Sequence, residues 1–379
     1  MKIKAIEPIA VDLPMHKPVT MAGETVARAD NMLIRVASDD GHVGWGEAAA
    51  APTMTGETVP GMIAAVRHLT PPLVGAPADE LAAATATMND VMYGNNAAKA
   101  AIEMALHDLV ARATARPLYA LFGTKLRSRI PVLAVLGSSI DADDLREAQE
   151  RWAAGYRAFK IKVGLSGPEA DAARTRAVCA LLKRHGETSG EGCLVSADAN
   201  QGFSVEEALR YVAALGDCGL DFFEQPVHAH DLDGMARVAA ASPVPIGADE
   251  GIHSLDDIER HRARRAAAGV SLKAIKLGGL RAMRDACRLC DRLGMKVNLS
   301  CKTGESSIAS AAALHLAATV PALAWGLTLT NAGLAEDVTA EPLRIEGGHA
   351  VVPDRPGLGI EVDEDRVRRR LPEGALRVA

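Results

Sequence analysis

The chain has 379 residues, a formal net charge of −6 and a pI near 6.0, and this length favours more than one folding unit. Hydrophobic residues make up 48% and charged residues 24%, as in ordinary globular proteins, and the mild acidity argues against a nucleic-acid partner. The apolar runs are too short to cross a bilayer and residues 1–20 lack the pattern of a secretory leader, so we expect a cytoplasmic protein with no membrane partner.

The first 125 residues predict an α+β domain. Residues 1–50 alternate apolar and polar side chains, and the segment SDDGH between two such runs predicts a strand–turn–strand arrangement. From residue 57 to residue 123 the pattern becomes helical, and NNAAKAAIEMALHDLVARATARPLYALFG carries apolar residues at helical intervals. We therefore place an N-terminal domain over residues 1–125.

Eight short apolar runs follow, separated by amphipathic segments. They begin near residues 130, 158, 193, 220, 245, 272, 296 and 324. Strands that alternate with helices at this spacing indicate repeated βα units, and eight parallel strands are the number that closes a barrel. A doubly wound open sheet is the alternative, but no GxGxxG follows the first strand. We expect a (β/α) barrel over residues 126–340 and a C-terminal segment, 341–379, that returns to the first domain.

Charged residues interrupt five consecutive strands of this predicted barrel. Buried parallel strands are normally apolar throughout, and the carboxyl ends of barrel strands are where active sites lie. The residues concerned are Lys160 and Lys162 on the second strand, Asp198 and Asn200 on the third, Glu224 on the fourth, Asp249 and Glu250 on the fifth, and Lys276 on the sixth. Lys160 and Lys162 are two residues apart, so both side chains point into the barrel. The pattern predicts one active site at this end.

Three of these side chains predict a metal site. Asp198, Glu224 and Asp249 come from adjacent strands and would crowd together with nothing to neutralise them, which a divalent cation would resolve. Carboxylates without Cys or His suit Mg²⁺, with Mn²⁺ as the alternative ion. Lysines on the flanking strands would face each other across the metal, whose charge lowers the pKa of a lysine enough for it to act as a base. This chemistry suits removal of the proton next to a carboxylate through a metal-stabilised enediolate.

These motifs resemble the enolase superfamily, specifically its muconate-lactonizing-enzyme subgroup within the mandelate racemase/muconate lactonizing enzyme family. GWGEA (44–48) and AAIEMALHDLVAR (100–112) are similar to capping-domain segments, and KIKVG, ADAN, FFEQP, GADEG and IKLGG match the barrel motifs in order. A lysine base with Mg²⁺ is an established pattern of that superfamily. The resemblance implies a modified TIM barrel, (β/α)7β, with an N-terminal α+β capping domain. It also implies a homo-oligomer and capping loops, near residues 15–24 and 51–57, that close over a small-molecule carboxylate substrate.

The resemblance also assigns roles. It implies that Lys162 is the base on one face of the substrate, that Lys276 is the acid/base on the opposite face, and that Lys160 tunes Lys162. The implied metal ligands are Asp198, Glu224 and Asp249, with Asn200 and Glu250 as groups that support them. Further pocket candidates are Cys301, Glu305 and Trp325. Packing is the alternative role for Trp325, and capping of the following helix is the alternative for Glu305.

The net reaction stays open between several classes. We expect an isomerase, either a cycloisomerase or a racemase/epimerase of a small carboxylic or amino-acid derivative, and the alternative is a dehydratase that eliminates a β-hydroxyl group. A Schiff-base lyase or aldolase would explain Lys276 but would leave the three carboxylates unneutralised. A zinc site is disfavoured because Cys287 and Cys290 form a CxxC within an amphipathic segment that lacks a second pair nearby.

Overall fold

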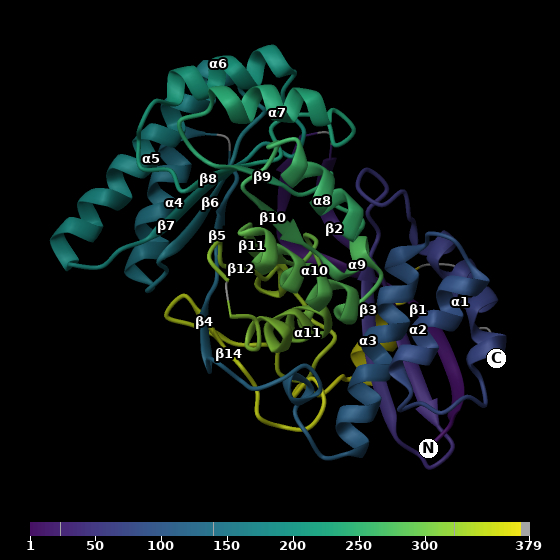
Figure 1. Cartoon of the computed structure of the whole chain (residues 1–379). Coiled ribbons are helices and arrows are strands. Elements are labelled where there is room, and N and C mark those ends of the chain that lie inside the picture. The colour runs from purple at the N-terminus through teal and green to yellow at the C-terminus, as the bar shows by residue number, and fades with distance from the viewer. Residues whose placement is uncertain (23, 139, 322, 373–379) are drawn as a thin grey trace.

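The computed structural model describes residues 1–22, 24–138, 140–321 and 323–372. Gly23, in the predicted loop 15–24, and residues 373–379 of the predicted C-terminal segment lie outside the described residues. An antiparallel sheet with its helices stands beside an eight-stranded parallel sheet that curves into a barrel (Figure 1). The predicted fold class, a modified barrel with an α+β capping domain, is confirmed.

The capping domain is built from three long antiparallel strands and three helices. The strands β1 (Ile3–Met21), β2 (Glu24–Ser38) and β3 (Val43–Ala49) pair in that order, and the predicted turn lies between β2 and β3. The helices are α1 (Val59–Leu73), α2 (Leu81–Val91) and α3 (Asn96–Ala113). Helix α3 packs against β3 at very short range, since a Cβ atom built on Gly46 would lie 2.0 Å from the carbonyl oxygen of Ala101. This contact explains the glycines of GWGEA.

The barrel follows the predicted order of strands. The strands are β5 (Ala134–Leu136), β6 (Ala158–Lys162), β7 (Leu194–Asp198), β8 (Phe222–Glu224), β9 (Ile246–Ala248), β10 (Gly269–Leu272), β11 (Lys296–Ser300) and β12 (Leu327–Thr328), each paired with its neighbour in sequence. The N–H of Leu133 donates to the carbonyl oxygen of Leu327 at 2.9 Å, which links the last strand to the segment before the first. The sheet is therefore closed at this seam.

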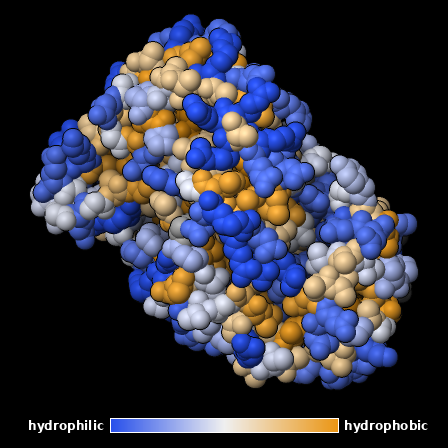
Figure 2. Space-filling view, viewed as in Figure 1, coloured by the Kyte–Doolittle hydropathy of each residue, from blue (hydrophilic) through white to orange (hydrophobic). Residues whose placement is uncertain are grey.

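Helices surround the barrel strands. They are α4 (Asp141–Ala153), α5 (Pro168–Ser189), α6 (Val205–Leu215), α7 (Leu232–Ala241), α8 (Leu255–Ala263), the short α9 (Ala274–Leu277), α10 (Leu280–Leu293) and α11 (Ser307–Ala317). Cys287 and Cys290 are both buried in α10, as the helical interpretation of the CxxC predicts. Hydrophilic and hydrophobic residues are interspersed over the face shown in Figure 2. Among the described residues, no helix combines the length and apolarity needed to cross a membrane.

The C-terminal segment touches both parts of the molecule. Strands β13 (Ile345–Glu346) and β14 (His349–Val351) form a small sheet with β4 (Arg129–Pro131), and α12 (Glu364–Arg369) follows. The N–H of Asp12 on β1 then donates to the carbonyl oxygen of Arg370 at 2.9 Å. The residue boundaries placed at 125/126 and 340/341 stay predictions.

Two buried carboxylates of the capping domain bind the barrel. Glu103 on α3 accepts hydrogen bonds from the backbone N–H groups of Leu280 (2.8 Å) and Arg281 (3.0 Å) at the start of α10. Glu47 on β3 likewise accepts from the N–H groups of Ser306 and Ala309 at the start of α11. Carboxylates favour helix N-termini because the unpaired amides there carry partial positive charge. These contacts fix the capping domain over the barrel mouth.

Candidate active site

The strand register brings the predicted site residues together. Lys162 pairs with Asp198 across β6 and β7, and Asp198 pairs with Glu224 across β7 and β8. Glu224 pairs with Gly247, so Asp249 lies two residues beyond that level, directly after the end of β9. Because parallel strands carry their carboxyl ends to the same rim, these three carboxylates occupy neighbouring positions. The structure therefore brings Asp198, Glu224 and Asp249 to one end of the barrel.

Lysines contact each of these carboxylates. Lys160 Nζ donates to both oxygens of Glu224, at 2.9 and 2.7 Å, and lies 3.8 Å from Asp198 Oδ2. Burial disfavours the charged form of Lys160, but the charges of Glu224, Asp198 and Asp249 outweigh it and raise its pKa. Lys162 Nζ donates to Asp198 Oδ2 at 2.7 Å. The expectation that nothing neutralises the carboxylates was wrong, because lysine ammonium groups already do so.

The sixth strand differs from the prediction. Strand β10 starts at Gly269 and ends at Leu272, so Lys276 lies in the helical turn α9 and not within a strand. Lys276 is completely buried, and its Nζ donates to Asp249 Oδ1 at 2.5 Å and to the carbonyl oxygen of Ser271 at 3.0 Å. It is absent from the described residues that line the cavity. The prediction that Lys276 lies within the sixth strand was wrong, because the chain turns after Leu272.

Lys273 occupies the position that was expected for Lys276. It follows β10 directly, lines the cavity and binds Asp249 Oδ2 through its ammonium group. Burial opposes protonation of Lys273, yet the charge of Asp249 outweighs it and raises the pKa. Strands β7, β8 and β9 lie between β6 and β10, so Lys162 and Lys273 face the cavity from opposite sides of the barrel. The sequence analysis missed Lys273 because it started the strand three residues late.

Asn200, Glu250 and Gln225 connect the charged groups. Asn200 Oδ1 accepts from Lys162 Nζ at 2.6 Å, and its Nδ2 donates to Glu250 Oε1 at 3.0 Å. Gln225, which the sequence analysis did not single out, accepts from the N–H of Asp249 at 2.8 Å. Asn200 and Gln225 both have positive φ values, 43° and 36°, which non-glycine residues adopt rarely and mostly at functional sites. The hydrogen bonds of Asn200 and Gln225 tie the ends of neighbouring strands together.

The other pocket candidates have different surroundings. Cys301 lines the cavity. Trp325 does not: it is 1% exposed and stacks on Phe222 with ring centroids 4.1 Å apart, so the packing alternative holds. Glu305 is buried beneath the rim, where its Oε2 accepts from the N–H of Lys302 at 2.9 Å. Burial, assisted by the charge of Glu47, raises the pKa of Glu305 to about 8.

The cavity at the barrel mouth is small and closed by the capping domain. Its volume is about 80 Å³, well below the roughly 300–1,000 Å³ of ordinary small-molecule sites. Capping residues that line it are Met21, Ala22, Glu24, Thr53 and Met54. All five belong to the two segments, residues 15–24 and 51–57, that were expected to close over the substrate. A substrate must displace part of this cover to enter.

The donor chemistry of the site fits a hard divalent cation. Asp198 and Asp249 line the cavity, and neighbouring Glu224 is hydrogen-bonded to Lys160. All three side chains offer oxygen atoms, which are the ligands that Mg²⁺ prefers. The Oε2 atom of neighbouring Glu250 is buried without a hydrogen-bond partner among the described residues. Within the same residues, no three His, Cys, Asp or Glu side chains already form a metal-binding group, because lysines occupy the carboxylates. The donor type fits the ion, and the three carboxylates share one rim of the barrel.

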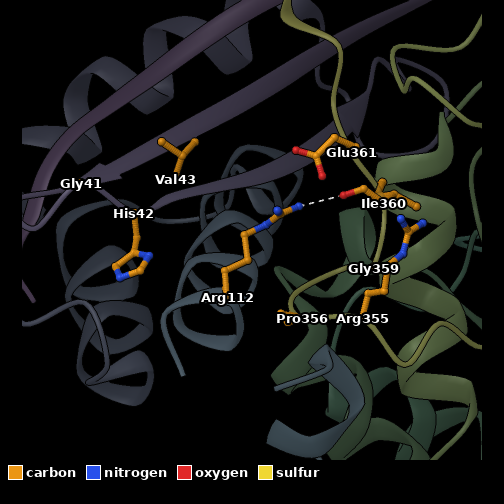
Figure 3. A pocket seen from close by; sticks show the side chains of 9 residues that line it. All are labelled: Gly41, His42, Val43, Arg112, Arg355, Pro356, Gly359, Ile360 and Glu361. Atoms are coloured by element: carbon orange, nitrogen blue, oxygen red, sulfur yellow. Dashed lines mark hydrogen bonds between the residues drawn. The ribbon is translucent and has the colours of Figure 1, made fainter. Parts of the chain in front are cut away.

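A second cavity lies outside the barrel mouth. It measures about 460 Å³ and is lined by His42, Arg112, Arg355 and Glu361, among others (Figure 3). Arg112 Nη2 donates to the carbonyl oxygen of Ile360 at 2.9 Å, so this cavity lies where α3 meets the C-terminal segment. None of its lining residues comes from the ends of the barrel strands. The candidate active site is therefore the smaller cavity.

Comparisons with known proteins cover nearly the whole chain. Residues 5–123 match the family model "Mandelate racemase / muconate lactonizing enzyme, N-terminal domain", and residues 143–366 match "Enolase C-terminal domain-like". The chain is 33% identical to muconate cycloisomerase 1 of Pseudomonas putida over 374 residues, which cover 97% of this chain and 98% of that protein. It is 30% identical to the N-succinyl-L-Arg/Lys racemase of Bacillus cereus, with 97% of each covered.

A solved structure agrees with these matches. The muconate lactonizing enzyme of Pseudomonas fluorescens, complexed with muconolactone, superimposes with a TM-score of 0.92 at 32% identity. The superposition covers 98% of this chain and 99% of that one, so it includes the capping domain as well as the barrel.

Proposed function

Because this chain belongs to the mandelate racemase/muconate lactonizing enzyme family of the enolase superfamily and is an enzyme of isomerase type, we propose that it removes the proton next to a substrate carboxylate in a Mg²⁺-dependent reaction. The observation that carries this proposal is the pair Lys162 and Lys273, which face one cavity from opposite sides of the barrel, with carboxylates at the ends of the three strands between them. A carbon atom held between two amines can lose a proton on one face and gain one on the other.

The lysines divide the proton transfers between them. One of Lys162 Nζ and Lys273 Nζ must be neutral to accept the proton, while the other is protonated and donates. Return of a proton to the opposite face inverts the configuration and gives racemisation or epimerisation. Delivery of a proton from one lysine to a substrate carbanion serves cycloisomerisation. Both relatives named above carry isomerase names, which favours these outcomes over dehydration.

Lys160 and the metal supply charge. We propose that Asp198, Glu224 and Asp249 hold Mg²⁺, with Mn²⁺ as the alternative ion, and that Asn200 and Glu250 keep these side chains in place. A divalent cation there would stabilise negative charge on the substrate carboxylate, which makes the adjacent proton easier to remove. Lys160 is held by two bonds to Glu224 and adds a fixed positive charge beside Lys162.

The assignment of the second lysine departs from the sequence-based expectation. We assign the acid/base role to Lys273 and a structural role to Lys276, because Lys273 lines the cavity whereas Lys276 is enclosed by Asp249 and Ser271. Cys301 is a cavity-lining residue in this proposal, and Glu305 supports the loop that carries Lys302.

Solvent deuterium uptake tests the proposal. We would incubate the enzyme in D₂O with N-acyl amino acids, proline derivatives and muconates, with Mg²⁺ or with EDTA, and follow the proton next to the carboxylate by NMR. The proposal expects Mg²⁺-dependent exchange or conversion of at least one compound class and none in EDTA. Turnover that is equally fast in EDTA would overturn the metal requirement.

We also propose a homo-oligomer in the cytoplasm. All six cysteines are free, which suits a reducing compartment. The homo-oligomer follows from the family resemblance, and light scattering during gel filtration tests it: a mass of one chain, 39.7 kDa, would contradict it.

A further inference from the structure

Arg174 is a buried charged residue that the proposed reaction does not use. It lies on α5, is 1% exposed, and its guanidinium group contacts two buried aspartates, Asp144 and Asp171. Its Nε lies 3.2 Å from Asp144 Oδ2, and its Nη2 donates to Asp171 Oδ1 at 2.7 Å. The same Nη2 also donates to the carbonyl oxygen of Lys162 at 2.8 Å. Arg174 therefore connects two acidic side chains to the backbone of the proposed base.

The loop after β5 lies beside the Lys162 side chain, and Asp144 holds this loop. Ser138 donates to Asp144 Oδ1 through its N–H at 3.0 Å and through its Oγ at 2.6 Å. A Cβ atom built on Gly137 would lie 3.5 Å from Cγ of Lys162, so the loop passes next to the methylene chain of the lysine. Asp144 thus fixes one wall of the space in which the Lys162 side chain lies.

The loop after β6 is held by Asp171. Its Oδ2 accepts from the N–H of Gly164 at 2.8 Å and from the N–H groups of the next two residues at 3.3 and 3.4 Å. A Cβ atom built on Gly164 would lie 3.0 Å from the carbonyl oxygen of Ala199, so this loop packs closely against the loop after β7. That second loop carries Asn200, whose Oδ1 accepts from Lys162 Nζ. Asp171 thus supports Lys162 from a second side.

Stability alone does not account for three charges in this place. Two carboxylates and a guanidinium group are costly to remove from water, and well-packed apolar side chains of similar volume are often equally stable. A guanidinium group differs from an apolar side chain because it presents several donors in one rigid plane. The charges therefore add direction: one planar group fixes the loop after β5, the loop after β6 and the Lys162 carbonyl relative to one another.

We propose that Arg174, together with Asp144 and Asp171, is the positioning residue that keeps the Lys162 side chain in the place from which it transfers a proton. This inference rests on the proposed function, in which Lys162 is one of the two proton-transferring amines. Arg174 contacts the backbone of Lys162 and is absent from the described residues that line the cavity, so it acts through the lysine. Misplacement of a reacting group by about 1 Å can cost about 10²-fold in rate.

Arg174→Lys is the variant that tests this role. It keeps a positive charge beside the aspartates, so the chain should fold, which circular dichroism checks. One ammonium group cannot reproduce the planar array of donors that reaches both aspartates and the Lys162 carbonyl. The Nζ of Lys162 should then leave its hydrogen bonds with Asp198 and Asn200 more often.

Chemical labelling measures the placement of Lys162 without requiring turnover. The folded enzyme would be treated briefly with acetic anhydride, and tandem mass spectrometry would give the extent of acetylation at each lysine. Lys273, which pairs with Asp249 on the other side of the barrel, is the internal reference. We expect the ratio of Lys162 to Lys273 acetylation to rise at least about fivefold in Arg174→Lys, as the loss of one hydrogen bond implies.

Arg176→Met is the matched control. Arg176 lies on the same helix and also donates to a backbone carbonyl, but this carbonyl belongs to Ala214 on α6 and the arginine is exposed. The variant removes an arginine from α5 without touching the surroundings of Lys162. It should keep the wild-type acetylation ratio.

A second variant, Ser138→Ala, changes the loop and leaves the three buried charges intact. It removes the hydrogen bond from Oγ to Asp144 at 2.6 Å and should raise the acetylation ratio in the same direction. The inference is overturned if Arg174→Lys and Ser138→Ala both keep the wild-type ratio, or if Arg176→Met shifts the ratio as much.

Proton exchange separates positioning from a general loss of structure. The L and D enantiomers of each N-acyl amino acid in the panel present the proton next to the carboxylate to opposite lysines, and the enantiomer whose exchange is abolished in Lys162→Ala reports on Lys162. For this enantiomer, Arg174→Lys should lower kcat for exchange by about 10–100-fold with little change in KM, while the other enantiomer keeps its rate. An equal loss for both enantiomers would indicate a merely structural role.

The two proposals fail separately. If no compound of the panel exchanges its proton but the acetylation ratio rises in Arg174→Lys and not in Arg176→Met, the proposed function fails and the positioning of Lys162 stands. If exchange occurs and the ratio is unchanged, or both enantiomers slow alike, the inference about Arg174 fails alone.

Discussion

Lys273 and Lys276 both bind the Asp249 carboxylate, one through Oδ2 and the other through Oδ1, yet only Lys273 lines the cavity. The two lysines are three residues apart, both beyond the end of β10, and they look alike in the sequence. Their surroundings in the structure differ. Lys273 faces the substrate space, and Lys276 holds Asp249 from beneath through bonds that also include the carbonyl oxygen of Ser271.

The variant Lys276→Met should mainly lose stability. Removing the buried ammonium leaves Asp249 with one counter-ion fewer and should cost about 3–5 kcal/mol in the free energy of unfolding. Urea unfolding followed by circular dichroism measures this loss. The folded variant should keep turnover within about tenfold, whereas Lys273→Met should lose about 10²–10⁴-fold as a general acid or base. Equal losses of turnover in the two folded variants would contradict the assignment.

The variant Asp198→Asn should weaken metal binding. The substitution replaces a carboxylate oxygen with a neutral amide, and Mg²⁺ affinity measured by calorimetry should fall more than about tenfold. Asp221→Asn is the control, because Asp221 accepts from the N–H of Val195 at the opposite end of the same strands. If Asp198→Asn binds Mg²⁺ like the wild type, this aspartate is no ligand.

The variant Gly46→Ala should destabilise the capping domain. An added Cβ would lie 2.0 Å from the carbonyl oxygen of Ala101 and 2.8 Å from the backbone nitrogen of Ala105, both on α3. Backbone atoms cannot rotate away, so β3 and α3 must separate, and we expect a loss of at least about 1–3 kcal/mol in chemical unfolding. Gly192→Ala is the control, since nothing lies within 4 Å of its added Cβ. Equal stability of the two variants would contradict this packing.

Stability should fall in mild acid because of His315. Burial lowers the pKa of this imidazole from 6.5 to about 4. Its ring accepts from the N–H of Tyr119 through Nδ1 at 3.3 Å and lies 3.0 Å from the carbonyl oxygen of Leu358 through Nε2, which leaves no place for a second ring proton. As the pH falls from 6.5 to 4, the unfolded chain binds a proton that the folded protein does not, so the folded state loses stability.

The His315 contribution should amount to about 3 kcal/mol over that window. Unfolding free energies of the wild type and of His315→Gln, measured at pH 7 and pH 4.5, isolate it. The variant should be less stable at pH 7 but should show the smaller decrease on acidification. Parallel pH profiles would show that His315 does not titrate in this range.

The sequence predicted much of this site because its signals are local. The KIK motif places Lys160 and Lys162 on one face of a strand, and acidic residues at the ends of apolar runs mark the barrel rim. Strand limits are less well defined: SLKAIKLGG is apolar on both sides of each lysine, so the end of β10 at Leu272 could not be inferred. The β-branched Val270 after Gly269 was the available signal for the earlier start.

Long-range contacts were beyond the reach of the sequence. Nothing in the neighbourhood of Lys302 indicates that Glu24, 278 residues away, supplies its counter-ion. The neutralisation of Asp198, Glu224 and Asp249 by lysines likewise depends on how side chains meet across the barrel. The role of Trp325 was undecided for the same reason, since its stacking partner Phe222 lies on another strand.

The proposed reaction requires two amines that act from opposite faces of one substrate carbon. Solvent deuterium incorporation next to the carboxylate, compared among the wild type, Lys162→Ala and Lys273→Ala with Mg²⁺ present, tests it most directly. We expect each variant to fold, to bind Mg²⁺ and to lose net isomerisation, while proton exchange survives on no more than one face of the substrate carbon. Wild-type net turnover in either variant would contradict it.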